Sequence, residues 1–85
     1  MTSAEIEIAI ALGQCTFLPR SPHKRFARNM AEMAQHRPMA QLSRAQRRYL
    51  TELVHRYRAQ IPLATVESAR AERMQLHLED NQLVA

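Results

Sequence analysis

The sequence contains no tryptophan and has one glycine and one cysteine among its 85 residues. A single cysteine excludes an intramolecular disulfide and any zinc site built from several cysteines. The scarcity of glycine argues against a β-rich fold and a glycine-rich phosphate loop, because both need the backbone freedom that glycine supplies. The length allows one small domain, and 46% apolar residues suffice for a modest core.

No apolar run reaches the roughly 20 residues that a transmembrane helix needs. The apolar stretch from Ile6 to Leu12 follows Glu5 and includes Glu7, whereas a secretory signal begins with positive charge. The unpaired Cys15 fits a reducing compartment. We therefore expect a soluble protein of the cytoplasm.

Positive charge is concentrated in the middle of the chain. Residues 20–58 hold ten lysines and arginines against two glutamates, whereas residues 1–19 and 59–85 are each weakly acidic. Eleven of the 12 cations are arginine, whose planar fork suits recognition of phosphate or carboxylate groups. A GC-rich genome is the alternative source of this arginine excess.

Two signals conflict over residues 3–12. Isoleucine and leucine alternate there with other residues, and this period of two is typical of a strand. Thr2 and Glu5 form a capping box, however, and Gly13 stands where a helix end often takes left-handed backbone. Because the sequence contains no second strand-like run, we predict a helix over this segment.

A second helix is predicted over residues 22–35. Ser21 is a suitable N-cap, and Pro22 fits the first helical position because its φ angle is already helical. Apolar residues follow at helical spacing, with cations on the opposite face. The connector before this helix is expected to bury Phe17 and Leu18 against the core.

A third helix is predicted from Ser43, which forms a capping box with Gln46, to about Gln60. Its apolar residues recur at i, i+1, i+4, i+5 and i+8, the spacing of an amphipathic helix. Pro62 ends it, because a proline ring clashes with the preceding helical turn. This apolar stripe consists of Tyr49, Leu50, Leu53, Val54 and Tyr57.

The remaining segment is more polar, and Thr65 is expected to cap a fourth, partly exposed helix. We predict an all-α fold, a small bundle of three to four short helices. Residues 1–62 would form the helical core domain and residues 63–85 the C-terminal helix. The expected core comprises Phe17, Leu18, Phe26, Met30, Tyr49, Leu50, Leu53, Val54 and Tyr57.

The pattern of reactive residues does not indicate catalysis. Cys15 is a potential nucleophile with His23 or His36 as base, but their spacing does not join them. The four histidines lie 13, 19 and 22 positions apart, and none pairs at i, i+4, so a metal site is not expected. We predict a protein without enzymatic activity, metal or cofactor.

The candidate binding residues lie in the second and third helices. Cations in the first turns of a helix can contact nucleic acid, although the connector between these helices is longer than a helix-turn-helix allows. A solvated basic surface is the alternative. Tyr57 could stack on a base between its two arginines, but membership of the core stripe is the favoured interpretation. The candidate partner- or nucleic-acid-binding residues are Lys24, Arg25, Arg28, Arg44, Arg47, Arg48, Arg56 and Arg58.

A series of short segments runs through residues 15–62: Thr16-Phe17-Leu18-Pro19, Lys24-Arg25-Phe26, Leu42-Ser43 through Gln46, Tyr49-Leu50, Arg56-Tyr57-Arg58 and Gln60-Ile61-Pro62. Together they resemble small uncharacterised helical proteins of phages, prophages and other mobile elements. Proteins of that size and source include anti-CRISPR inhibitors, which bind a host surveillance complex. Many such inhibitors are acidic nucleic-acid mimics, whereas this chain is basic, so mimicry is not expected.

We therefore expect a non-enzymatic binding protein that docks its arginine-rich face on a host nucleoprotein complex or nucleic acid. The resemblance makes an anti-CRISPR-like inhibitor the specific candidate. Neither a small-molecule substrate nor a membrane is expected as a partner. The alternative is a DNA- or RNA-binding transcriptional regulator that acts as a homodimer through its C-terminal helix. A structural or assembly factor with merely surface charge is the third hypothesis.

Overall fold

The computed structural model describes the backbone of residues 1–84 and the side chains of residues 1–79. Within this part the chain forms α-helices only, apart from one short 3-10 helix, and no strand is present, so the all-α prediction is confirmed. The isoleucine-rich first segment is helical despite its period of two. The elements are α1 (Ser3–Gly13), α2 (Pro22–His36), α3 (Arg44–Arg56), η1 (Arg58–Gln60) and α4 (Leu63–Val84).

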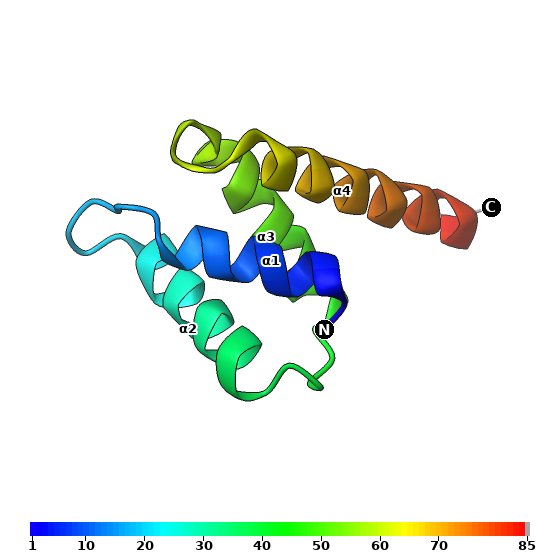
Figure 1. Ribbon diagram of the computed structural model, residues 1–85. Helices are drawn as coiled ribbons and strands as arrows, with labels where there is room; N and C mark the ends of the chain where they lie inside the picture. The colour runs from blue at the N-terminus through cyan, green and yellow to red at the C-terminus, as the bar shows by residue number, and fades with distance from the viewer. Residues whose placement is uncertain (85) are drawn as a thin grey trace.

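Helix α1 is the centre of the arrangement. It crosses the molecule between α2 on one side and α4 on the other, and it also packs against α3 (Figure 1). Helices α3 and α4 pack on each other and run in opposite directions, because Arg44 near the start of α3 lies beside Glu79 late in α4. The helix over residues 63–84 therefore packs on both α1 and α3.

The core is built around α1, which the sequence-based core list omitted. Ile8, Ala9 and Leu12 are fully buried there. Each of the other α-helices adds buried apolar side chains, whereas Leu18, expected in the core, is 79% exposed. The remaining buried apolar residues are Ala27, Met30, Ala34, Leu42, Leu50, Leu53, Val54, Ile61, Val66, Ala69 and Leu76.

Gly13 has a different role from the one its position suggested. Its backbone is not left-handed, and it is the last residue of α1, followed by Gln14 in the right-handed region. A Cβ atom at this position would lie 2.6 Å from the Cβ of Ala31 in α2. The glycine therefore permits close packing of α1 on α2, and the expected left-handed helix cap is wrong.

The predicted N-terminal caps of the first three helices are confirmed. Thr2 with Glu5, and Ser43 with Gln46, form complete capping boxes, in which each side chain accepts a hydrogen bond from the backbone N–H of the other residue. The Ser21 hydroxyl accepts a hydrogen bond from the His23 backbone N–H at 3.2 Å. These motifs are local, so they form as the sequence indicates.

The two later helix boundaries differ from the predictions. Helix α3 ends at Arg56 rather than near Gln60, and the chain tightens into η1 before Pro62. Thr65 does not cap α4, which already begins at Leu63. Its buried hydroxyl donates instead to the Glu7 Oε1 atom of α1, at 3.1 Å. None of the helices, over the residues described, has both the length and the apolar character needed to cross a membrane.

Candidate nucleic-acid interface

The cations predicted in α2 remain on the outer surface of that helix. Lys24, Arg25 and Arg28 are all exposed, while the buried side of α2 carries Ala27 and Met30. Helix α2 lies across α1 from α4 (Figure 1). None of these three cations lines the hollows that carry the α4 arginines Arg70 and Arg73.

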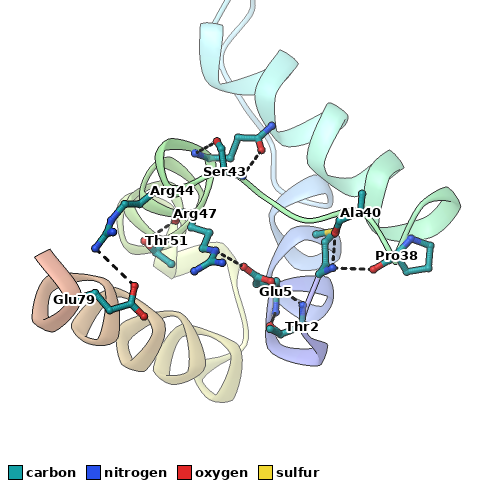
Figure 2. A network of polar contacts seen from close by, with 11 residues as sticks. Thr2, Glu5, Pro38, Ala40, Ser43, Arg44, Arg47, Thr51 and Glu79 are labelled. Atoms are coloured by element: carbon teal, nitrogen blue, oxygen red, sulfur yellow. Dashed lines mark hydrogen bonds and ion pairs between the residues drawn. The ribbon is translucent and has the colours of Figure 1, made fainter. Parts of the chain in front are cut away.

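Two of the predicted α3 arginines are directed at carboxylates of the same chain (Figure 2). The Arg47 Nε atom lies 3.3 Å from Glu5 Oε2 of α1, and Arg44 Nη2 lies 3.7 Å from Glu79 Oε2 of α4. The Glu5 side chain is 7% exposed, so its contact with Arg47 is shielded from water on the carboxylate side. Arg44 and Arg47 thus tie α3 to its two neighbouring helices.

The connector between α2 and α3 is held at the same end of the molecule. The N-terminal ammonium group of Met1 donates hydrogen bonds to the carbonyl oxygens of Pro38 and Ala40 (Figure 2). The buried Leu42 follows within this connector. The connector is therefore anchored to the start of α1, and it fixes where α3 begins.

The antiparallel pairing of α3 and α4 gathers exposed arginines from both helices. Three surface hollows lie along this pair, and Arg73 of α4 lines all three. Arg70 lines one of them, Arg48 a second and Arg56 the third. Glu52 is the one carboxylate among the described residues that line these hollows. We call this surface the α3–α4 basic face, formed by Arg48, Arg56, Arg70 and Arg73 with His55 and His77.

The structure therefore combines two predicted residues, Arg48 and Arg56, with two that the sequence reasoning missed. Arg70 and Arg73 lie in a segment of net negative charge, which concealed them in a count along the chain. Their spacing of three residues, which places both on one side of a helix, is the signal that could have identified them. Arg48 also makes an interaction within the chain.

The last predicted site residue, Arg58, supports the end of α3. Its Nη1 atom donates a hydrogen bond to the His55 carbonyl oxygen at 2.9 Å, which satisfies an acceptor in the final turn. Tyr57 beside it is partly buried and packs against the core, as the sequence analysis favoured. Its ring meets Phe17 edge-on, with 4.7 Å between the ring centroids.

Cys15 occupies an environment that favours the neutral thiol. Its Sγ atom lies 3.6 Å from the Ala11 carbonyl oxygen, and burial raises the pKa of the thiol above its ordinary value. A cysteine nucleophile needs the opposite shift. Among residues 1–79, no three side chains of histidine, cysteine, aspartate or glutamate are grouped so that they could hold a metal ion.

No protein-family model, curated protein or solved structure matches the chain. The α3–α4 basic face is therefore the feature of the molecule that points to a function.

Proposed function

We propose that the chain is a non-enzymatic helical binding protein that docks its α3–α4 basic face on the nucleic-acid path of a nucleoprotein complex. The observation that carries this proposal is the convergence of four arginines from two helices around hollows with a single carboxylate. Arginine forks bind phosphate oxygens in pairs, and the arginines that line a series of hollows can contact successive phosphates of one strand.

The arrangement suits a polyanion better than an acidic protein surface. Arg70 and Arg73 are exposed on α4, and Arg48 and Arg56 are exposed on α3. Positive charges spread over two neighbouring helices can contact several phosphates of one nucleic-acid backbone. The basic charge also favours contact with nucleic acid over imitation of it.

The resemblance to small proteins of phages and mobile elements supports a more specific candidate within this proposal. A host CRISPR surveillance complex carries guide and target strands that such a basic face would meet. The chain would then act as an anti-CRISPR-like inhibitor inside the bacterial cytoplasm. This candidate rests on the resemblance, whereas the binding surface rests on the positions of the arginines.

The proposal is tested by removing charge from this face and, in a matched control, from the outer surface of α2. The variant R70Q/R73Q and the control K24Q/R28Q each lose two exposed positive charges. We expect R70Q/R73Q to weaken binding to DNA and RNA oligonucleotides about tenfold or more at low salt, because each arginine supplies charge-assisted hydrogen bonds. Fluorescence anisotropy measures the affinities.

The control variant should bind as the unchanged chain does. Equal weakening by K24Q/R28Q would show that affinity follows net charge rather than the α3–α4 basic face. Absence of binding to any nucleic acid at about 50 mM salt would contradict the proposal, because phosphate contacts are strongest there. Circular dichroism of each variant establishes that its helices are intact.

A dimeric DNA- or RNA-binding regulator is the second candidate, and the outer side of α4 favours it. Met74 and Leu78 are 64% and 50% exposed, and they lie one turn apart on the same side of the helix. Pairing with a second copy would cover them. Sedimentation at micromolar concentration measures the mass of the particle in solution. A mass of 9.8 kDa, which is that of one chain, would exclude the dimeric regulator.

A further inference from the structure

All phenylalanine and tyrosine side chains of the protein lie in one row with His23. The row starts at Phe17, passes through Tyr57, His23 and Tyr49, and ends at Phe26. Successive ring centroids are 4.7, 6.1, 5.9 and 4.3 Å apart. These residues come from the first connector, α2, α3 and the position just after α3, so the row forms an aromatic seam between α2 and α3.

Tyr49 contacts two other members of this row. Its hydroxyl group lies 2.7 Å from His23 Nδ1, and its ring packs at 4.3 Å on Phe26. The residue is only partly buried, and it lines a hollow of about 340 Å³ beside the seam. A ring fixed by two neighbours offers a contact surface without losing side-chain entropy when a ligand binds.

The same hollow carries charges from α3 and α4. Arg56 and Arg73 both line it, so the hollow opens directly onto the α3–α4 basic face. Glu52 lines it as well and provides a hydrogen-bond acceptor. One hollow thus combines an aromatic ring, two phosphate-binding groups and one acceptor, contributed by α3 and α4.

We propose that this hollow holds one unstacked base of a single-stranded nucleic acid, with the base against Tyr49 and flanking phosphates on Arg56 and Arg73. The inference rests on the proposed nucleic-acid function and names the strand form that it recognises. Proteins that bind single strands combine a basic groove with aromatic rings in this way. A duplex keeps its bases stacked and paired, and it cannot present one to the hollow.

Glu52 adds a preference among bases. Its carboxylate accepts hydrogen bonds from an exocyclic amino group, which cytosine and adenine possess, whereas thymine has no amino group and its one pairing-edge donor is the ring N3–H between two carbonyl oxygens. We therefore expect oligo(dC) to bind more tightly than oligo(dT). The variant E52Q, whose amide can donate as well as accept, should narrow this difference.

The experiment uses tyrosine fluorescence, which can be observed because the chain has two tyrosines and no tryptophan. In the variant Y57F, Tyr49 is the one remaining tyrosine. Stacking of a base on Tyr49 should quench its emission when oligo(dC) is added at neutral pH. Duplex DNA of the same length should quench little, and a lack of quenching by bound oligo(dC) would overturn the inference.

Affinity measurements on two further variants separate this inference from the proposed function. Y49L should weaken oligo(dC) binding about tenfold without changing the salt dependence, whereas Y49F, which keeps the ring, should retain most of the affinity. If Y49L binds normally while R70Q/R73Q binds weakly, the base site is wrong and the proposed function stands. If neither single strands nor duplexes bind the unchanged chain, the proposed function itself fails.

Discussion

At the scale of single residues, Glu5 combines two structural roles. Its Oε1 atom accepts a hydrogen bond from the Thr2 backbone N–H at 2.7 Å, and Oε2 lies 3.3 Å from the Arg47 guanidinium. The first contact completes the cap of α1 and the second joins α1 to α3. The buried Glu5 carboxylate, whose side chain is 7% exposed, is thereby compensated by contacts with Thr2 and Arg47.

The variant E5Q separates these roles. Glutamine keeps an acceptor for the capping box but removes the charge opposite Arg47. We expect a loss of about 1–2 kcal/mol in the free energy of unfolding. This is less than the cost of breaking a fully buried ion pair, because the Arg47 side chain is 41% exposed. Urea denaturation measures it.

The exposed Glu32 on α2 provides the matched control for this measurement. The same chemical change there, E32Q, should alter the free energy of unfolding by less than about 0.5 kcal/mol. A similarly small effect for E5Q would mean that the contact between Arg47 and the Glu5 carboxylate does not stabilise the folded state.

Local residue roles were predictable to the extent that they depend on sequence neighbours. Thr2 and Ser43 cap their helices as the pattern indicates, because a cap needs only the following turn. Leu18 and Thr65 were misplaced, since their surroundings depend on distant segments. Hydrophobicity placed Leu18 in the core, but its connector leaves that side chain in solvent.

At the scale of elements, the contact between α1 and α2 depends on Gly13. Gly13 has no Cβ atom, and a Cβ added at this position would come within 2.6 Å of the Ala31 Cβ. Such a distance cannot be accommodated unless one of the two helices shifts, because neither methyl group is a flexible side chain.

The variant G13A should therefore destabilise the protein by about 1–3 kcal/mol, although alanine is the better helix former. The double variant G13A/A31G restores the space and should recover most of that loss. Thermal denaturation of the single and double variants completes a double-mutant cycle. Additive effects of the two substitutions would show that the helices do not meet at this point.

Helix positions were largely predictable, but the partner of each helix was not. Capping indicates where α1, α2 and α3 begin, and periodicity supports α2 and α3, since both are local properties. The placement of α1 at the centre of the core follows from its neighbours on both sides, which no local pattern shows. The tertiary bond from Thr65 to Glu7 is likewise absent from any window around Thr65.

At the scale of the whole molecule, folding rearranges the charge. Along the chain, the cations concentrate in residues 20–58 and the last segment is acidic. In the folded chain, Arg44 and Arg47 lie beside carboxylates. Arg70 and Arg73 lie with Arg48 and Arg56 on the α3–α4 basic face. The sequence could therefore predict a basic surface, but its composition depends on the antiparallel pairing of α3 and α4.

The salt dependence of nucleic-acid binding tests the central claim most directly. Each arginine that contacts a phosphate contributes about 0.7 units for a single strand, or about 0.9 for a duplex, to the slope of log affinity against log salt concentration. We predict that R70Q/R73Q lowers that slope by about 1.4 units on a single strand, while K24Q/R28Q leaves it unchanged. An unchanged slope for R70Q/R73Q, or an equal fall for K24Q/R28Q, would contradict binding through the α3–α4 basic face.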